Sequence, residues 1–394
     1  MTDYDVVVVG GGPAGLWFAK RAAERDVKVL VLERKKEIGT PVQCAEGFGL
    51  GGMKKLGIEP DARWSGWNVH GAKLYAPNGK FVYVPGEGFV IERKIFEKEL
   101  AKIATRAGAR VLAFHEVTDI IKENGEIVGV RARFLGEERE FYANIVVAAD
   151  GFESRIARLA GLNTTQIAYH VDSGFEYQMA GLEIDADNIH LFFGKSIAPR
   201  GYIWIFPTDK DAANVGIGID ARSPVSAREY LERWMRAHPE YGFDGATILE
   251  VRGGGVPVGG LMRDLTMDHF MVVGDAAHQV HPLHGGGMFL AMEAAEVAAD
   301  VAAKAVELGD FSNAVLSEYS RRWWSMRGEQ LEKLVKVRQV LERLEDEDFN
   351  KLAEIFSHED ILAFSEGKLS ALKRILPKLV KYPRLVEILR PLIF

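Results

Sequence analysis

Residues 4–15, YDVVVVGGGPAG, decide the fold of the N-terminal part of this chain. A β-branched run that ends at a glycine is typical of a buried parallel strand. The next stretch, LWFAKRAAERD, predicts a helix, and VKVLVLER then predicts a second strand that ends in Glu33. Together the three elements form a βαβ unit with the pattern G-x-G-x-x-G at its first turn.

Each glycine of this turn has its own physical role. Gly10 allows the tight turn, Gly12 lets the backbone approach a pyrophosphate, and Gly15 lets the helix and the strand pack closely. The positive end of the helix dipole faces the phosphates, and Glu33 can accept hydrogen bonds from ribose hydroxyls. We therefore expect a dinucleotide rather than a glycine-rich turn without a ligand. These residues alone do not distinguish NAD from FAD.

The composition excludes several classes of protein. The 394 residues are 47% hydrophobic and 27% charged, which is typical of a soluble globular protein with two or more domains. The single cysteine, Cys44, cannot form an internal disulfide or a metal cluster, so we expect a reducing, cytoplasmic compartment and no metal. The N-terminus shows no secretory signal, and no apolar run could span a bilayer. The net charge of −7 argues against nucleic-acid binding.

Two later strands end in aspartate motifs. Residues 144–151, NIVVAADG, predict a strand that ends at Asp150 and is followed by a helical stretch. Residues 269–288 contain a strand that ends at Gly274-Asp275, and the glycines at 285–287 then open a long helix. The glycine-rich segment 252–260 does not lie between a strand and a helix, so we expect no second dinucleotide site. The absence of a CxxxxC motif after the first unit excludes a disulfide reductase.

This ordered set of motifs resembles the flavin hydroxylase superfamily, whose fold is that of p-hydroxybenzoate hydroxylase. The resemblance implies an FAD cofactor, with Asp275 on its ribityl chain and the amides of Gly287 and Met288 at the N1–C2=O edge of the flavin. A helix N-terminus stabilises the negative charge that the reduced flavin carries there. Arg93 resembles the superfamily arginine that contacts the cofactor, and an ion pair with Glu97 is the alternative.

The cofactor-binding residues expected on this basis are Gly10, Gly12, Pro13, Ala14, Gly15, Glu33, Arg34, Cys44, Ala45, Gly47, Arg93, Val117, Asp150, Gly274, Asp275, Pro282, Gly285, Gly287 and Met288.

Residues 40–47, TPVQCAEG, place Cys44 in a loop bounded by proline and glycine. This loop resembles a narrower group, the archaeal geranylgeranyl reductases, which carry P-x-x-C-x-E-G there. A second signature of that group, Y-x-W-x-F-P, matches residues 202–207, and the resemblance covers nearly the whole chain. It implies FAD-dependent saturation of C=C bonds in the geranylgeranyl chains of archaeal membrane lipid precursors.

The second signature also has a physical meaning. Side chains alternate between the faces of a strand, so Tyr202, Trp204 and Phe206 share one face and form an aromatic wall suited to an apolar chain. An ordinary buried strand is the alternative.

The candidates for the proton donor are Cys44, Tyr202, His281 and His284. The two imidazoles could titrate near neutral pH, or they could merely hydrogen-bond the backbone.

Two other functions stay open. An FAD-dependent monooxygenase acting on an aromatic or isoprenoid substrate would consume oxygen, and a non-catalytic flavoprotein would only relay electrons. Without a second dinucleotide site, electrons must come from ferredoxin or from NAD(P)H that docks transiently.

We expect an α/β (α+β) protein of three parts. A Rossmann-like FAD-binding domain with p-hydroxybenzoate hydroxylase-like topology comprises residues 1–75, 91–165 and 250–310. A β-sheet substrate domain comprises residues 66–90 and 165–250. A helical C-terminal region follows at 311–394.

The C-terminal end is basic. Seven Lys/Arg against two Glu between residues 366 and 394 give it a charge of +5, so the rest of the chain carries −12. Apolar residues recur there at helical spacing, and prolines are expected to break the helix into short pieces. Such a strip could lie on an anionic membrane surface, or it could be a set of packing helices with a solvated basic face. The apolar residues are Leu369, Leu372, Ile375, Leu376 and Leu379, and the prolines are Pro377, Pro383 and Pro391.

Overall fold

The computed structural model describes residues 2–368 and 370–393, and within them it contains two eight-stranded sheets. In the first sheet the order is β15-β16-β9-β1-β2-β6, and β8 pairs with both β9 and β7. Its strands are β1 (Tyr4–Val9), β2 (Val29–Leu32), β6 (Arg110–Leu112), β7 (Glu116–Glu123), β8 (Glu126–Phe134), β9 (Glu137–Ala148), β15 (Thr266–Met267) and β16 (Phe270–Val272).

The βαβ unit predicted at the N-terminus is confirmed. Strand β1 pairs in parallel with β2 and β9, with Val6 opposite Val29 and Ile145. Val6 is fully buried, as the β-branched run predicted. Helix α1 (Pro13–Ala23) connects β1 to β2 and contacts both α3 (Arg93–Arg106) and α6 (Met288–Leu308).

The second sheet has the order β14-β10-β13-β12-β11-β4-β5-β3. Ile203 and Ile205 are fully buried in a core that also contains Leu231 and Trp234 of α5 (Ala227–Ala237). The glycine-rich segment from 252 lies in β14, which is antiparallel to β10, so it has no Rossmann setting. The strands are β3 (Gly47–Gly49), β4 (Trp67–Tyr75), β5 (Phe81–Val90), β10 (Val171–Ala180), β11 (Ile189–Phe193), β12 (Tyr202–Asp209), β13 (Ala212–Asp220) and β14 (Thr247–Pro257).

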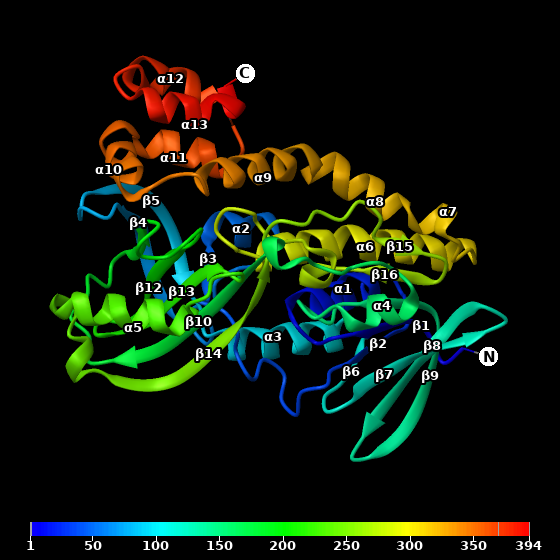
Figure 1. Cartoon of the computed structure of the whole chain (residues 1–394). Coiled ribbons are helices and arrows are strands. Elements are labelled where there is room, and N and C mark those ends of the chain that lie inside the picture. Colours follow the sequence, from blue (N-terminus) through cyan, green and yellow to red (C-terminus); the bar gives the residue numbers. More distant parts are fainter. Residues whose placement is uncertain (1, 369, 394) are drawn as a thin grey trace.

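The last part of the chain is helical, as predicted. Figure 1 shows the two sheets side by side, with α9 running above them and the final helices above the second sheet. A π-helical segment, Trp324–Gly328, joins α8 to α9. The helices not yet named are α2 (Leu50–Lys55), α4 (Arg155–Ala160), α7 (Asn313–Leu316), α8 (Glu318–Trp323), α9 (Glu329–Leu341), α10 (Asp346–Ile355), α11 (His358–Ser365), α12 (Ser370–Leu379) and α13 (Pro383–Ile393).

The expected effect of the C-terminal prolines is wrong at two of three positions. Pro377 lies inside α12 and Pro391 inside α13, whereas Pro383 begins α13. Each internal proline removes one backbone N–H donor from the last turn of its helix, and the packing of both helices in the third core offsets this loss.

The apolar stripe of this region packs inward where the structure describes it. Ile375 and Leu379 are buried in a third core together with residues of α9, α10, α11 and α13, and Leu376 is half-buried. Leu369 and the side chain of Leu372 lie outside the described residues. Among the helices of the described residues, none is long and apolar enough to cross a bilayer.

The architecture confirms the predicted fold class. We propose the same three-part division into domains, with one adjustment: β14 carries the second sheet to Pro257, beyond the expected boundary at 250.

Candidate functional site

A cavity of about 1440 Å³ is lined by residues of both sheets and of helices α9 to α11. Typical small-molecule pockets measure roughly 300–1,000 Å³, so this one has room for a dinucleotide and a second molecule. Its polar end is formed by the glycine turn after β1 and by the motifs at Asp150 and Asp275. Its apolar end is formed by β4, β5, β11, β12 and the C-terminal helices.

The three glycines of the first turn differ in what surrounds them. Gly10 has a φ of +113°, and a Cβ there would lie 2.2 Å from the carbonyl oxygen of Ala149. A Cβ on Gly15 would lie 2.0 Å from the oxygen of Gly10, so only glycine lets α1 approach β1. Around Gly12 nothing lies within 4 Å of the Cβ position. The backbone at Gly12 therefore borders open space at the N-terminus of α1, where a phosphate group fits.

The acidic residues of the polar end leave acceptors available for a ligand. Glu33 is buried, and its two carboxylate oxygens accept hydrogen bonds from the backbone N–H groups of Gly11 (2.7 Å) and Lys35 (2.8 Å). Each oxygen can still accept a second bond, as ribose binding requires. Asp150 accepts from the backbone of Ile156 through Oδ2 (2.9 Å), but its buried Oδ1 has no partner among the described residues.

Asp275 lies beside the N-terminus of α6. A Cβ on Gly287 would lie 3.1 Å from its Oδ1, and burial raises the pKa of its carboxyl. No side-chain hydrogen bond reaches Asp275 from the described residues. Unpartnered acceptors and a bare glycine turn fit a hydroxyl-rich dinucleotide such as a flavin cofactor.

Arg93 forms the ion pair with Glu97 that the sequence offered as the alternative, and it also lines the cavity. It is the first residue of α3, and its Nε lies 2.6 Å from Oε1 of Glu97. Burial opposes its charge, but Glu97 and Cys44 more than offset this and raise the pKa of Arg93. A permanent positive charge therefore stands next to the cysteine loop.

The cysteine loop and the aromatic strand are in contact. A Cβ on Gly47 would lie 2.6 Å from the ring of Phe206, and one on Gly216 would lie 2.3 Å from the ring of Trp204. The absence of a side chain at Gly47 and at Gly216 therefore leaves room for the rings of Phe206 and Trp204. Burial raises the pKa of the Cys44 thiol, which accepts a hydrogen bond from the backbone N–H of Glu46 (3.2 Å).

The sequence left two roles open for His281 and His284, titration near neutral pH and hydrogen bonding to the backbone, and the structure supports the second. The rings stack with their centroids 3.7 Å apart, and burial lowers the pKa of His281 to about 4. Although His284 is exposed to the cavity, desolvation lowers its pKa well below the ordinary value. Neutral imidazoles fit their contacts: Nε2 of His281 donates to the carbonyl of Ser365 (2.8 Å), and the Nδ1 of His284 accepts from the backbone of Gly286 (3.1 Å).

Tyr202 is also held in a backbone contact. Its hydroxyl donates to the carbonyl oxygen of His284 at 2.6 Å, and burial raises its pKa. Both effects keep the proton on the phenol, so Tyr202 is a weak acid in this position.

The cavity brings the predicted site residues together, with two exceptions. Gly15 serves helix packing, and the carbonyl of Pro282 accepts a hydrogen bond from Arg338 of α9 (2.8 Å). The residues that line the cavity are Gly10, Gly12, Pro13, Ala14, Glu33, Arg34, Cys44, Ala45, Gly47, Arg93, Val117, Asp150, Tyr202, Trp204, Phe206, Gly274, Asp275, His281, His284, Gly285, Gly287 and Met288.

Sequence reasoning missed a buried charge cluster at this cavity. Glu46, Glu176 and Arg252 all line it, and the Nε1–H of Trp204 donates to Oε2 of Glu176 (2.7 Å). Glu46 belongs to the P-x-x-C-x-E-G signature and could have been found there. Glu176 and Arg252 are charged residues within strands, a weak signal because such positions usually face solvent.

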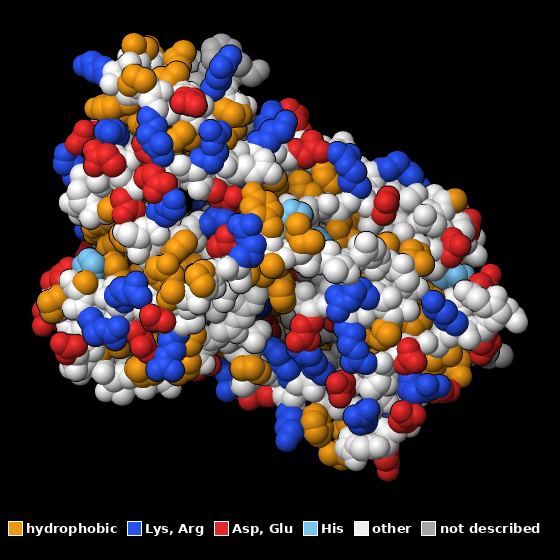
Figure 2. All heavy atoms as spheres, in the orientation of Figure 1, with side chains coloured by type: hydrophobic (Ala, Val, Ile, Leu, Met, Phe, Trp, Pro, Cys, Tyr) orange, Lys and Arg blue, Asp and Glu red, His pale blue; other side chains and the backbone are white. Residues whose placement is uncertain are grey.

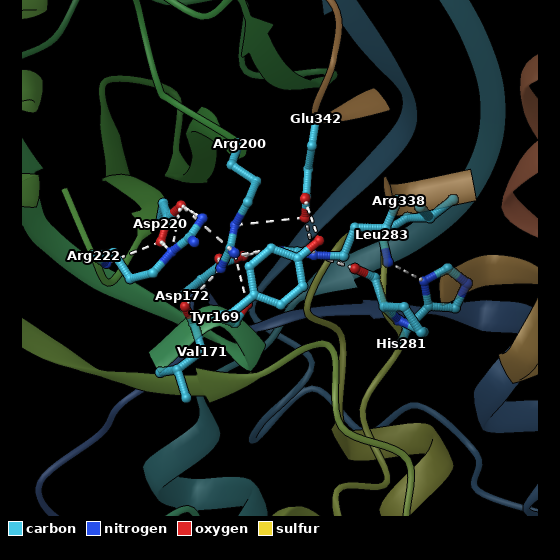
Figure 3. A network of polar contacts seen from close by, with 11 residues as sticks. Tyr169, Val171, Asp172, Arg200, Asp220, Arg222, His281, Leu283, Arg338 and Glu342 are labelled. Atoms are coloured by element: carbon cyan, nitrogen blue, oxygen red, sulfur yellow. Dashed lines mark hydrogen bonds and ion pairs between the residues drawn. The ribbon is translucent and has the colours of Figure 1, made fainter. Parts of the chain in front are cut away.

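A second buried network joins the loop before α6 to α9 (Figure 3). Arg338 donates to both carboxylate oxygens of Asp172, at 2.7 and 2.9 Å, and its Nε lies 3.1 Å from Oε1 of Glu342. Arg200 donates to the same Asp172 (2.8 Å), and Tyr169 donates to Glu342 (2.8 Å). Because Arg338 also holds Pro282, the C-terminal helices are tied directly to the loop before α6.

A Rossmann unit that opens into an apolar cavity defines a dinucleotide-binding protein with room for a second, apolar ligand. Its similarity to known proteins identifies it as a flavin-dependent oxidoreductase. Residues 170–256 match the family model of the geranylgeranyl reductase catalytic domain, and residues 4–173 match that of pyridine nucleotide-disulphide oxidoreductases. Digeranylgeranylglycerophospholipid reductase 2 of Methanopyrus kandleri is 39% identical, over 97% of this chain and 99% of that one. The reductase of Methanothrix thermoacetophila is also 39% identical, over 95% and 97%. The chain belongs to the digeranylgeranylglycerophospholipid reductase family.

Solved structures agree with this assignment. A geranylgeranyl bacteriochlorophyll reductase-like protein from Thermoplasma acidophilum superimposes with a TM-score of 0.89, at 33% identity and over 99% of both chains. The flavin-dependent brominase Bmp2 has a TM-score of 0.74 at 18% identity, over 97% of this chain and 99% of that one, which shows the shared fold alone.

Proposed function

We propose that this chain is an FAD-dependent reductase that saturates C=C bonds in the geranylgeranyl chains of digeranylgeranylglycerophospholipids. The observation that carries the proposal is one continuous cavity with a dinucleotide-type polar end and an apolar end. The match of this chain to reductases named for that substrate supports the assignment.

The residues of the polar end support a proposal for how FAD is held. The amides around Gly12 and the N-terminus of α1 would bind the pyrophosphate, Glu33 a ribose and Asp275 the ribityl chain. The N-terminus of α6, at Gly287 and Met288, would face the pyrimidine edge of the flavin. When bound and reduced, FAD supplies a hydride to one carbon of the alkene.

The apolar end suits a prenyl chain. Its walls come from β12, which carries Tyr202, Trp204 and Phe206, from β4, β5 and β11, and from helices of the third core. These side chains exclude water and hold a flexible chain against the site, which favours reaction of a poorly activated double bond. The wall residues include Leu74, Val84, Leu191, Phe193, Leu341, Phe349, Leu352 and Phe356.

The proposal is tested by mass spectrometry of a geranylgeranyl lipid after anaerobic incubation with the flavin-loaded protein and dithionite. We expect a gain of two hydrogen atoms for each double bond reduced. A product that gains oxygen, and forms only in air with NADPH, would instead establish the monooxygenase. Unchanged lipid beside a flavin that still cycles would establish an electron relay.

We further propose that the electron donor, ferredoxin or NAD(P)H, docks only transiently. The glycine-rich segment from 252 supports this proposal because it forms part of an antiparallel strand. Anaerobic flavin absorbance after addition of reduced ferredoxin or of NADPH identifies the donor. A tight stoichiometric complex with NADPH would contradict transient docking.

The basic C-terminal helices support a peripheral contact with an anionic membrane at the cytoplasmic face. Arg374, Lys378, Lys381, Arg384 and Arg390 are exposed, and Figure 2 shows basic and hydrophobic side chains together at that end of the molecule. Arg374 and Arg384 also pair with Asp360 and Asp348, so Lys378, Lys381 and Arg390 supply most of the attraction. Each basic residue near an anionic surface contributes about 1 kcal/mol. Co-sedimentation with anionic liposomes tests this contact, and equal binding by a form that lacks residues 370–394 would disprove it.

A further inference from the structure

Two buried carboxyl groups share one buried guanidinium where the cysteine loop meets the second sheet. Glu46, Glu176 and Arg252 are only 4%, 3% and 7% exposed. The second guanidinium nitrogen of Arg252 bonds Glu250 (2.8 Å), whose side chain is 39% exposed. Since an unpaired buried charge is costly, one of the two buried carboxyls must keep its proton.

The hydrogen bonds identify which carboxyl that is. Glu46 accepts from the Nδ2 of Asn214 (2.8 Å), from Arg252 (2.7 Å) and from the backbone N–H of Arg93 (3.0 Å). Several donors on one carboxyl favour its ionised form. Glu176 accepts two hydrogen bonds, one from Trp204 (2.7 Å) and a longer one from Arg252 (3.2 Å). The proton therefore resides on Glu176, the carboxyl with fewer donors.

Glu176 also lies in the right place to use that proton. It lines the cavity, and the indole of Trp204 fixes its carboxyl beside the aromatic wall. Through Arg252, which also donates to the carbonyl of Cys44 (3.2 Å), the carboxyl is tied to the cysteine loop.

We propose that Glu176 is the general acid that protonates one alkene carbon in the reduction, an inference that rests on the proposed function. Burial raises the pKa of its carboxyl to about 8, with Arg252 and Trp204 opposing the rise and Glu46 adding to it. A general acid works best when its pKa lies near the operating pH. The sequence candidates fail this criterion: Cys44 and Tyr202 have raised pKa values, and His281 and His284 are neutral imidazoles.

The step balances in atoms and charge. The O–H bond of Glu176 breaks as a C–H bond forms at one alkene carbon, and the other carbon accepts hydride from the reduced flavin of the proposed function. The π bond is replaced by two C–H bonds, and Glu176 is left as a carboxylate. Arg252 and the Trp204 N–H then stabilise that carboxylate until solvent water returns a proton.

The first experiment needs no cofactor or substrate. Infrared spectra of the cofactor-free protein near neutral pH should show the carbonyl stretch of a protonated carboxylic acid. The band should be lost as the pH rises through about 8. It should vanish in Glu176→Gln and persist in Glu250→Gln, the matched control, which bonds the same arginine from outside the cavity. An unchanged band in Glu176→Gln overturns the proposal. The absence of the band in the unaltered protein also overturns it, and that result does not depend on whether a variant folds.

The second experiment measures single-turnover reoxidation of the dithionite-reduced protein by a geranylgeranyl lipid. If the unaltered protein gives no saturated lipid, the proposed function itself fails. If it is active, Glu176→Gln should be slower by roughly 10²–10⁴-fold, and Glu176→Asp should recover part of the loss. A Glu176→Gln rate equal to that of the unaltered protein overturns the assignment.

The pH profile adds an independent check. The rate should fall as the pH rises past about 8, because the acid form of Glu176 is lost, and Glu176→Asp should shift that limb. The charged groups that face Glu176 are Arg252, Glu46 and, through Arg252, Glu250, with Arg93 behind Glu46. A falling limb that stays unshifted in Glu176→Asp contradicts the proposal.

Discussion

Arg338→Gln should destabilise the protein far more than Arg222→Gln, although both arginines belong to one network. The side chain of Arg338 is 7% exposed and bridges Asp172, Glu342 and the carbonyl of Pro282. Without it, Arg200 is the nearest remaining cation to the buried Asp172 (2.8 Å) and the half-buried Glu342 (3.6 Å). Removal of one partner of a buried ion pair costs about 3–5 kcal/mol.

The control variant, Arg222→Gln, removes an arginine from an ion pair that is exposed to solvent. The side chain of Arg222 is 51% exposed and pairs with Asp220, so its loss should cost only about 0–1 kcal/mol. Urea unfolding near neutral pH, followed by tryptophan fluorescence, measures the free energy of unfolding of both variants. We expect a difference of at least about 2 kcal/mol. Equal losses would show that the buried charges are compensated in another way and would refute the reasoning.

Three further predictions follow from the site. Gly12→Ala should unfold at nearly the same urea concentration as the unaltered protein, yet bind flavin more weakly. Gly15→Ala should lose about 1–3 kcal/mol of stability, because its methyl group meets the oxygen of Gly10. Similar unfolding curves for the two variants would contradict this. Iodoacetamide should alkylate Cys44 more slowly than a cysteine peptide at mildly alkaline pH, because burial raises its pKa and the thiolate is the reactive form; mass spectrometry with a urea-unfolded control measures the rates. The free energy of unfolding should rise between about pH 4 and 6.5, where the unfolded chain binds more protons than the folded one, and His281→Gln should flatten this rise; an identical slope would exclude His281.

The sequence predicts the fold well where local pattern and tertiary structure demand the same thing. The valine run at 6–9 can only be a strand buried on both faces, and the glycines that follow leave few other turns possible. The helix from Met288 to Leu308 is equally evident from its composition. The C-terminal prolines misled because propensity describes an isolated helix, while packing of Ile375, Leu385 and Leu389 decides the actual one.

The site was harder to predict because its chemistry depends on long-range neighbours. His281 and His284 have the right residue type for a titrating pair, but their pKa values are set by burial against residues as distant as Ser365. Glu176 and Arg252 meet only because β10 and β14 are adjacent in the second sheet. No local spacing encodes that meeting.

The contribution of α9 to α11 to the cavity has a consequence for biosynthesis. The residues that line its polar end run from Val9 to Ala291, so a ribosome completes them before it adds the helices that close the apolar end. The first core, however, also takes in Leu316, Tyr319, Trp323 and Leu331 from the following helices. A chain that ended soon after residue 310 would therefore lose part of the core beneath the nucleotide site as well as the wall of the lipid compartment.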